Sequence, residues 1–502
     1  MTIVHNEVEE LKEFDAAFSH AQHMVEVLTG ADGEAMTHDE AEEYIREQGN
    51  EFLRRLLQGY LNHRSAAEVR ASEIIGTDNT ARNSRRSRKR DLECIFGTVT
   101  LNRRTYECKD RESLYPLDAS LNLPTAKYSH GLQQIVAKEL AKGSTDATVE
   151  LINRMTGGHV PKRQVLQAAI RVSQDFEAFY QQGLRSYPEA STNNILVLTT
   201  DGKGIVMRPE WLREQTRKAA QREQHKKLTR LSKGEKKNRK RMATVASVYS
   251  IQPQPRDPDD LLIHLDDEPR TPRPRPENKR VWASIERSGD QVIDEMFAEA
   301  LHRDPEQRRP WVILVDGEPH QLRRIKRALK QHKLNATIIV DFIHVLEYLW
   351  KAAYGFFDVN DEQVEEWVLE RAVKVLKGSA SQVAAGIRRS ATRKGLSPKQ
   401  RKPIDTCADY LLKYKSMLRY DLYLASGFPI ATGVIEGACR HLINDRLDIT
   451  GARWSLPGAE AVLKLRSLNS SGDFDAYFEF YQAQEYKRNY ASKFQQTLEQ
   501  AS

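Results

Sequence analysis

Three short apolar runs in the middle of the chain each end in a carboxylate, and this feature restricts the fold more than any other. They are ILVLTTDG at 195–202, WVILVDG at 311–317 and ATIIVDFIH at 336–344. A short run of this kind is typical of a strand that is buried on both faces of a sheet. A helical pattern, RRIKRALKQHK, separates the second run from the third. Strand, helix and strand in this order predict a mixed α/β sheet.

The acids in these runs, Asp201, Asp316 and Asp341, form a candidate metal site. Acids at the ends of neighbouring strands can meet in one crevice. Clustered carboxylate oxygens are the ligands that Mg²⁺ and Mn²⁺ prefer, and two such ions can hold the attacking and leaving oxygens of a phosphodiester displacement. The alternative is that each Asp-Gly is only a turn after a strand, because both residues favour turns. Two Asp-Gly pairs after nearly identical runs favour the metal site.

Positive charge is concentrated in one segment beside these runs. Residues 213–241 contain 13 Lys or Arg and three Glu, a local excess that is larger than the net charge of +7 of all 502 residues. A solvated basic helix is the usual origin of such a run. Here the size of the excess favours contact with the phosphates of a nucleic acid. The DNA-binding residues predicted in this segment are Lys226, Lys227, Lys236, Lys237, Arg239, Lys240 and Arg241.

Upstream of the apolar runs, the sequence predicts helices followed by one hairpin. Apolar residues recur at helical spacing up to about residue 77. A basic run without any acid, RNSRRSRKR, occupies residues 82–90. The stretch behind it, CIFGTVTLNRRTYEC, alternates like two short strands that turn near Gly97.

Residues 131–190 have the pattern of a helix-turn-helix. Two helical segments are followed by Gly157 and Gly158, and a third helix begins after them. Lys162 and Arg163 stand at the start of this third helix, where basic side chains suit groove insertion and phosphate contact. The alternative is an ordinary helical hairpin with a glycine turn.

Downstream of the apolar runs, helices dominate the pattern. Residues 345–428 contain four helical segments, and a further helix is centred on Glu436. Residues 471–502 are expected to form a polar helix and tail. No apolar run is long enough to span a membrane, and the acidic N-terminus has no apolar signal core, so we expect a cytoplasmic protein.

Together these motifs resemble a known family. TTDGKG, VDGEPHQLRRI, VDFIHVLEYLW and GVIEGACRHLINDRLDITGARWS are similar to bacterial insertion-sequence transposases of the Kra type, which are related to the Mutator-like group. The resemblance covers about residues 195–470, and FGTVTLNRRTYEC, PLDASLNLP and YSHGL upstream also look like this group. It implies a ribonuclease-H-like catalytic domain that is interrupted by an all-helical insertion.

The resemblance also implies a role for each acid. Asp201 would end the first strand of the catalytic sheet, Asp316 would end the fourth, and Glu436 would come from the helix after the insertion. These three would bind two Mg²⁺ or Mn²⁺ ions. Asp341 and His344 match an accessory motif whose first position is cysteine in many relatives. Asp341 is therefore a second candidate for the triad position that we assign to Asp316. We choose Asp316 because VDGEPHQ matches the family position. His344 would orient an acid or touch a phosphate, unless it is a core histidine.

The activity implied is that of a DNA transposase, a nuclease and polynucleotidyl transferase that cuts at the terminal repeats of an element and joins them to target DNA. Arg453 would hold a backbone phosphate, and Trp454 would contact DNA, as an aromatic ring can by stacking on a base. A homodimer or larger assembly on DNA is expected, because two ends must be brought together. The alternatives are a ribonuclease-H-like nuclease without strand transfer and a non-catalytic DNA-binding regulator derived from a transposase.

The predicted fold is thus a multidomain α/β protein, in which a ribonuclease-H-like mixed sheet with an all-helical insertion follows a mostly helical DNA-binding region. Its predicted parts are a helical region at 1–80, the basic run and hairpin at 81–130, the helix-turn-helix at 131–190, the catalytic core at 191–344 with a basic insertion at 208–241, the helical insertion at 345–428, the glutamate helix at 429–470 and the tail at 471–502.

Overall fold

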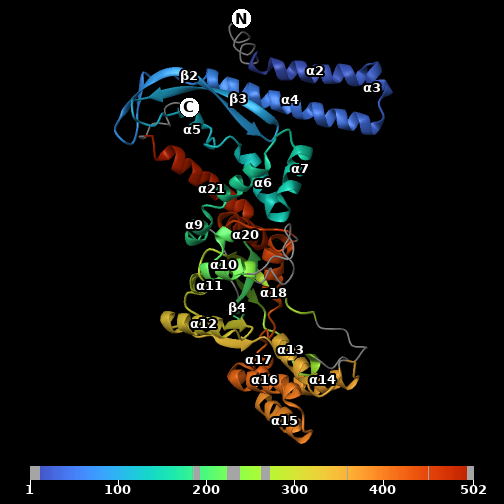
Figure 1. Ribbon diagram of the computed structural model, residues 1–502. Coiled ribbons are helices and arrows are strands. Elements are labelled where there is room, and N and C mark those ends of the chain that lie inside the picture. The colour runs from blue at the N-terminus through green and yellow to red at the C-terminus, as the bar shows by residue number, and fades with distance from the viewer. Residues whose placement is uncertain are drawn as a thin grey trace. The chain divides into compact units, whose positions relative to one another are not determined.

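The structure, a computed structural model, describes residues 12–183, 185, 193–222, 238–261, 272–358, 360–449 and 451–494. The chain divides into two compact units (Figure 1). The terminal unit consists of residues 1–182 and 473–502, and the central unit consists of residues 183–472. Each unit combines helices with a β-sheet, so the predicted mixed α/β class is confirmed, and the two units are compatible with a multidomain protein.

The central unit is built on a mixed five-stranded sheet. Side by side, its strands are β6 (Glu277–Ser284), β5 (Lys240–Ile251), β4 (Ile195–Val206), β7 (Trp311–Val315) and β8 (Thr337–Val340). β4 pairs antiparallel with β5, and β5 with β6, whereas β4, β7 and β8 are parallel neighbours. Every side chain of β7 and the first six of β4 are buried. The three predicted apolar runs therefore form three adjacent strands.

Helices pack around this sheet, and a further group of helices lies away from it (Figure 1). Those around the sheet are α10 (Glu214–Arg222), α11 (Gly289–Arg303), α12 (Pro319–His332), α18 (Gly433–Cys439), α19 (Asp445–Leu447) and α20 (Leu456–Ser471), with the π-helical segment η6 (Arg440–Asn444) and the 3-10 turns η2 (Pro209–Trp211) and η4 (Asp259–Leu261). α11 packs on β5, α20 on β6, and α18 on β4 and β5. None of the helices in the described ranges combines the length and apolar character needed to cross a membrane.

The segment predicted as an all-helical insertion is helical in the structure. It contains α13 (Phe342–Ala353), α14 (Gln363–Leu376), α15 (Ala380–Arg393), α16 (Pro398–Tyr414), the 3-10 turn η5 (Lys415–Met417) and α17 (Tyr420–Ala425). The fourth predicted helix is divided at η5 into α16 and α17. α13 packs against α14 and α16, and α15 packs against α16, so these helices form a layer of their own.

The structure corrects the prediction for residues 195–207. We expected a strand that ends at Asp201, but β4 is a single strand that continues to Val206. β5 pairs with it along its whole length. The parallel partner β7, in contrast, pairs only with residues 196–199 of β4. Asp201 consequently lies inside β4, just beyond the point at which its pairing with β7 stops.

Two further corrections concern the strands that follow. β5 begins at Lys240, so Lys240 and Arg241 belong to the sheet and not to the basic insertion predicted at 208–241. β6 and α11 were not predicted. β6 begins directly behind a stretch rich in Pro and Arg, which hides the short apolar run VWAS that forms its buried half.

A buried carboxylate ties α20 to the end of β6. Glu460 is 4% exposed and accepts hydrogen bonds from Ser284 Oγ at 2.8 Å and from the backbone nitrogens of Ile285 and Glu286 at 2.9 and 3.2 Å. Ser471, at the other end of α20, donates from its hydroxyl to the carbonyl oxygen of Val281 at 3.1 Å. These contacts hold the edge strand β6 against the helix that covers it.

Burial gives Glu460 a predictable effect on stability. Desolvation raises the pKa of its carboxyl above the ordinary value for glutamate. The stability from this group is fully present below the unfolded-state pKa, near about 4.3, and is lost as the pH rises through the folded-state pKa. The free energy of unfolding of Glu460→Gln, measured with urea at several pH values above about 4.3, should therefore fall less steeply with pH than that of the wild type. Parallel profiles would contradict this assignment.

The terminal unit contains a three-stranded antiparallel sheet of β1 (Glu73–Ile75), β2 (Ala81–Cys94) and β3 (Gly97–Glu107). Its helices are η1 (Lys12–Phe14), α2 (Asp15–Thr29), α3 (Ala31–Ala35), α4 (His38–Ala66), α5 (Pro116–Ser120), α6 (His130–Lys142), α7 (Thr145–Met155), α8 (Lys162–Val172), α9 (Phe176–Gln181), α21 (Phe474–Tyr486) and the π-helical segment η7 (Lys487–Ala491). α4 packs on β3, and α2 packs on α4 (Figure 1). The core beneath the hairpin is made of Leu61, Leu92, Cys94, Val99, Leu101 and Leu117.

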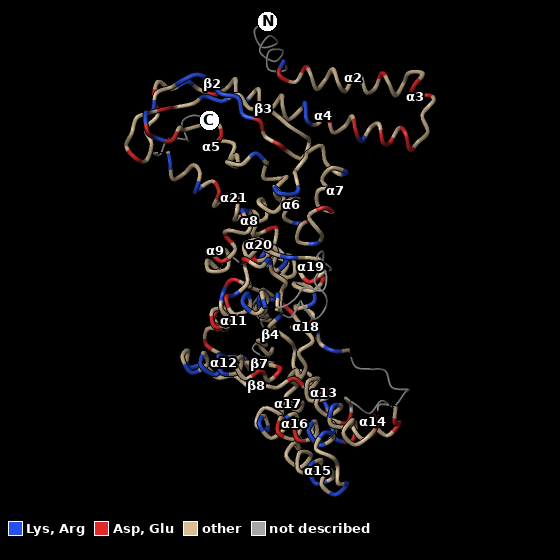
Figure 2. The backbone as a smooth tube through the Cα atoms, in the orientation of Figure 1, with Lys and Arg blue, Asp and Glu red and all other residues tan. Residues whose placement is uncertain are grey.

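The hairpin of this unit follows the predicted pattern, but the stretch expected to be helical up to about residue 77 ends in the strand β1, which was not predicted. Two further corrections apply. Cys94 pairs with Gly97, so the hairpin turns where we expected. The basic run at 82–90 does not precede the hairpin but is part of β2, as Figure 2 shows by the Lys and Arg residues along this strand. The segment 471–502 contains the predicted helix, α21, but this helix is not the polar one that we expected, because most of its aromatic side chains are buried.

Candidate active site

The parallel strands bring three acids to the same level of the central sheet. The last paired residues of β4 and β7 lie two positions before Asp201 and Asp316. The last paired residues of β7 and β8 lie one position before Asp316 and Asp341. The same register, continued along the chain, sets Asp201 beside Asp316 and Asp316 beside Asp341. The predicted acids are therefore neighbours along one edge of the sheet.

Asp341 is the most buried of these acids, and its hydrogen-bonding capacity is filled. It is fully buried and caps the N-terminus of α13. Its Oδ1 accepts from the nitrogens of Ile343 at 3.0 Å and Thr432 at 3.4 Å, and its Oδ2 bonds to Thr432 Oγ1 at 2.6 Å and His344 Nδ1 at 2.9 Å. The four bonds use the roughly four lone-pair sites of a carboxylate. This bonding favours a positioning role for Asp341 over metal binding.

Glu436 reaches this group from α18. Its Oε1 lies 3.3 Å from the Thr432 hydroxyl, which also bonds to Asp341. One ligand atom each of Asp341, His344 and Glu436 lies within 4.8 Å of the other two, a spacing compatible with one metal ion. Glu436 is exposed, and a Cβ on Gly433, which lies one turn earlier on the same helix face, would meet no described atom within 4 Å. The face of α18 that carries Glu436 is therefore open to a substrate.

Asp316 lies in a turn that tyrosines of α16 hold in place. Tyr410 donates to the carbonyl oxygen of Asp316 at 3.1 Å, and Tyr414 donates to that of Gly317 at 2.5 Å. Gly317 has a φ of +91°, which favours glycine at this position. Asp316 Oδ1 accepts from the nitrogen of Glu318 at 2.9 Å, and within the described ranges its Oδ2 accepts no hydrogen bond. Asp316 thus has an oxygen available for a metal ion, which Asp341 has not.

Asp201 is held from two sides. Its Oδ1 accepts from the nitrogen of Gly202 at 2.6 Å, and its Oδ2 accepts from the thiol of Cys439 at 3.2 Å. Cys439 is 3% exposed and ends α18, one turn after Glu436. Burial and then the charge of Asp201 raise the pKa of this thiol, so it remains a neutral donor. The π-helical segment η6 follows at once, and such segments are frequent at functional sites.

The electrostatics of the site show an excess of negative charge. Burial raises the pKa of Asp316, and the nearby charge of Asp201 raises it further. The pKa of His344 is raised mainly by its hydrogen bond to Asp341. Asp341, Asp316 and Glu436 thus lie near His344, and Asp201 lies near Asp316. A bound cation would relieve this repulsion.

The predicted DNA-binding residues of the basic segment divide into three cases. Lys226, Lys227, Lys236 and Lys237 lie outside the residues that the structure describes. Arg239 is 8% exposed, with Nη2 directed at the carbonyl oxygen of Ala220, so a direct phosphate contact does not fit its position. Lys240 lies 3.3 Å from Asp448, and Arg241 donates to the carbonyl oxygen of Ile285 at 3.0 Å, so both have structural contacts within the sheet region.

The remaining DNA-binding candidates lie at different places. Trp454 bridges to the end of β4, since its nitrogen donates to Val206 and its carbonyl oxygen accepts from Arg208, and its indole nitrogen donates to Leu447. The guanidinium carbon of Arg446 lies 4.8 Å from the centre of the Trp454 ring. These contacts give Trp454 a structural role, whereas its neighbour Arg453 is exposed. In the terminal unit, Lys162 and Arg163 are exposed at the start of α8, and Lys162 pairs with Asp146 at 2.5 Å.

Several residues of the site were missed by the sequence analysis. Thr432 links Asp341 to Glu436, Cys439 holds Asp201, and Tyr410 and Tyr414 fix the turn of Asp316. Their signal was weak, because a threonine before a helix or a tyrosine on a helix has many other uses. Only the position of Thr432 just ahead of the glutamate helix could have drawn attention.

Comparisons with known proteins add no assignment to this site. No protein-family model matches the chain, and no curated protein matches its sequence.

Proposed function

We propose that this chain is a DNA transposase that cleaves phosphodiester bonds at the ends of a mobile element and joins them to target DNA. In this proposal the central unit is a ribonuclease-H-like catalytic domain with Asp201, Asp316 and Glu436 as its acidic triad. Mg²⁺ or Mn²⁺ would be the cofactor. The protein would act in the bacterial cytoplasm, at the nucleoid, as a homodimer or a larger assembly on DNA.

The observation that carries the proposal is the gathering of these acids from remote parts of the chain. β4 is the first strand of the five-stranded sheet in chain order, and β7 is the fourth. α18 follows the helices α13 to α17. These are the places that the resemblance to Kra-type transposases assigns to Asp201, Asp316 and Glu436. The agreement supports the proposal because three segments far apart in sequence must fold together to produce it.

The donor atoms at the site fit a divalent cation. Asp201, Asp316 and Glu436 offer carboxylate oxygens, which Mg²⁺ and Mn²⁺ prefer. The raised pKa of Asp316 reflects burial and a neighbouring negative charge, and a cation would compensate for both. When two such ions are bound, they activate the attacking water or hydroxyl and stabilise the leaving oxygen.

The residues around the acids hold them in fixed positions. Asp341 fixes Thr432, and the Thr432 hydroxyl restrains Glu436. The Cys439 thiol restrains Asp201 in the same way. Such preorganisation supports catalysis, because the acids need not reorient when the substrate binds. Asp341 and His344 are therefore positioning residues in this proposal.

A plasmid assay tests the proposed function. The full-length protein is incubated with Mg²⁺ and a plasmid that carries the DNA from both sides of its own gene, where the ends of an element would lie. We expect cut ends with a free 3′-hydroxyl and, when target DNA is added, joined products. EDTA should abolish both products, and Asp201→Ala should yield neither.

Each rival predicts a different result in this assay. Cleavage without joined products would identify a nuclease that does not transfer strands. Binding of the flanking DNA without any cleavage by the wild type would identify a non-catalytic regulator. Both results would contradict the proposal, and inverted repeats on the two sides of the gene would mark the DNA ends to be tested first.

A further inference from the structure

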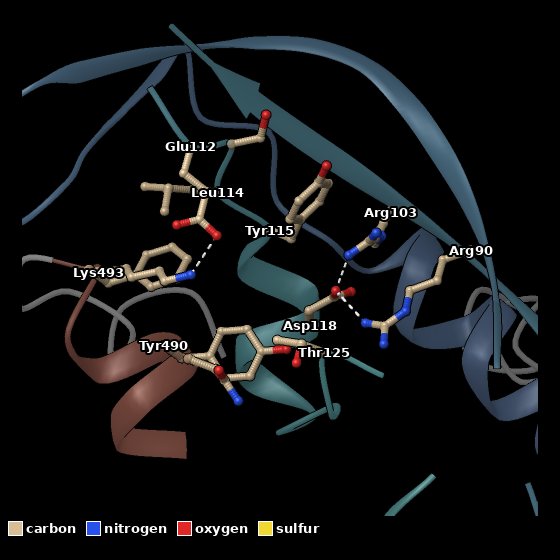
Figure 3. A pocket seen from close by; sticks show the side chains of 12 residues that line it. Arg90, Arg103, Glu112, Leu114, Tyr115, Asp118, Thr125, Tyr490 and Lys493 are labelled. Atoms are coloured by element: carbon tan, nitrogen blue, oxygen red, sulfur yellow. Dashed lines mark hydrogen bonds and ion pairs between the residues drawn. The ribbon is translucent and has the colours of Figure 1, made fainter. Parts of the chain in front are cut away.

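The terminal unit contains a pocket that the proposed chemistry does not use. It has a volume of about 430 Å³, which lies within the range of small-molecule sites. It is formed by the β2–β3 hairpin, by α5 and by the end of the chain around η7 (Figure 3). The residues that matter for its chemistry are Arg90, Arg103, Tyr115, Asp118, Tyr490 and Lys493.

Two arginines enter this pocket because the inner face of the hairpin continues into it. Strand alternation places Arg90 and Leu92 on one face of β2, and Val99, Leu101 and Arg103 on the corresponding face of β3. The three apolar residues belong to the core of the unit. The arginines follow them along the same face, and each arginine side chain is only 13% exposed. The sequence pattern therefore turns positive charge inward at this end of the hairpin.

The two buried guanidinium groups share one carboxylate. Arg90 pairs with Oδ2 of Asp118 at 2.8 Å, and Arg103 pairs with the same oxygen. Lys493 adds no net charge, because it pairs with Glu112 at 2.6 Å. One positive charge is thus left without a counter-ion among the described lining residues. Arg90 also donates to the carbonyl oxygens of Pro124 and Ala126, so the uncompensated charge lies mainly on Arg103, and an anion beside Arg103 would be stabilising.

Individual atoms point to the same conclusion. Arg103 Nε and Asp118 Oδ1 are both buried and have no hydrogen-bond partner in the described part of the chain. Burial, together with the charge of Arg90, lowers the pKa of Arg103 to about 10, which is a sign of incomplete compensation. The free donor and the free acceptor suit a ligand that offers both an anionic oxygen and a hydroxyl or amino group.

Aromatic rings form the walls beside these charges. Tyr115 and Tyr490 lie on opposite sides of the opening, with Arg90, Arg103 and Asp118 together at one end (Figure 3). The Arg103 guanidinium lies 3.8 Å from the centre of the Tyr115 ring, which supports it by a cation–π contact. Tyr490 is fixed by its hydroxyl, which donates to the carbonyl oxygen of Leu123 at 2.5 Å. Aromatic rings stack on bases, and arginines pair with phosphates.

We propose that this pocket binds a nucleotide, with its phosphate on Arg103 and Arg90 and its base against the ring of Tyr490. A free nucleotide and a nucleotide within a DNA strand share this chemistry, and the experiment below separates the two sources. The proposal is independent of the acidic site in the central unit, since none of its residues takes part.

Binding measurements on the full-length protein test the pocket. The probes are inorganic phosphate, dAMP and a labelled single-stranded oligonucleotide. Arg103→Gln removes the charge, and Thr125→Phe fills the pocket from its exposed rim while leaving both arginines in place. Lys89→Gln is the matched control, because Lys89 is an exposed basic residue of the same strand as Arg90 and does not line the pocket. Melting temperatures identify any variant that fails to fold. If Arg103→Gln does not fold, Thr125→Phe still tests the pocket.

We expect Arg103→Gln and Thr125→Phe to weaken binding about tenfold, as the loss of one charge-assisted hydrogen bond would. Lys89→Gln should have a much smaller effect. A loss seen with dAMP identifies a site for free nucleotides, and a loss seen only with the oligonucleotide identifies a site for a DNA strand. Competition by inorganic phosphate would support the phosphate contact. The proposal is overturned if the wild type binds neither dAMP nor the oligonucleotide, or if both variants bind them as the wild type does.

Discussion

Replacing Asp316 by asparagine is expected to abolish DNA cleavage without destabilising the fold. The change keeps the shape of the side chain and the oxygen that accepts from Glu318, but it removes the negative charge. In an acidic triad that acts as one unit, such a loss should lower the cleavage rate by at least about 10³-fold. The raised pKa of Asp316 means that its charge opposes folding at neutral pH, so the melting temperature should stay the same or rise.

The prediction is specific because the cleavage rate should fall while the melting temperature stays the same or rises. An acid that serves only the fold would lose stability on replacement, whereas an acid held for chemistry loses activity alone. Asp294→Asn is the matched control, because Asp294 is an exposed aspartate of α11 in the same unit. It should leave both the rate and the melting temperature unchanged. If Asp316→Asn cleaved DNA at the normal rate, Asp316 would not be a member of the acidic triad. Asp341 would then be the candidate for its position.

A second large effect is expected on stability when Glu299 is replaced by alanine. Glu299 is 7% exposed and accepts from Arg280 at 2.5 Å and from Arg303 at 2.7 Å. Arg280, in β6, is 2% exposed and lies against the ring of Trp282 at 4.3 Å. Removing one partner of a buried ion pair leaves charge insufficiently compensated and costs about 3 to 5 kcal/mol.

Urea denaturation of the full-length chain measures this loss. The transition of the central unit should move to clearly lower urea, because β6 and α11 lose the most buried of the ion pairs that join them, Arg280 with Glu299. Glu306→Ala is the control with the same change of side chain, since Glu306 pairs with Arg308 at a position where both side chains are 67% exposed. An exposed pair of this kind contributes about 1 kcal/mol or less. Equal shifts in the two variants would show that the Glu299 cluster does not stabilise the unit.

Much of the central sheet could be predicted because its strands have a strong local signal. The apolar runs are buried along all of β7, the first half of β4 and the second half of β8, and such strands need no partner to be recognised. β6 lacks that signal, because its first residues are charged and its Arg280 is buried only through pairing with Glu295 and Glu299. A buried arginine cannot be distinguished from a surface arginine before its partners are known.

The candidate site was predictable in its acids but not in their supports. Asp341 and His344 are three residues apart at a helix start, so their contact follows from local geometry. The contacts of Cys439 with Asp201 and of Tyr414 with Gly317 join residues far apart in the sequence, and no local pattern encodes them. The basic residues illustrate the same limit, since Arg239 is one of a charged run and is nevertheless buried.

The central claim is that Asp201, Asp316 and Glu436 bind the same divalent ions, and iron-mediated cleavage of the polypeptide tests it most directly. Fe²⁺ that replaces Mg²⁺ generates hydroxyl radicals in the presence of ascorbate and peroxide, and these radicals cut the chain beside the metal. For the full-length protein with DNA from both sides of its gene, we predict cuts close to residues 201, 316 and 436, all suppressed by excess Mg²⁺. Cuts confined to other segments, or cuts at these three that persist in excess Mg²⁺ and in Asp201→Asn, would contradict the account.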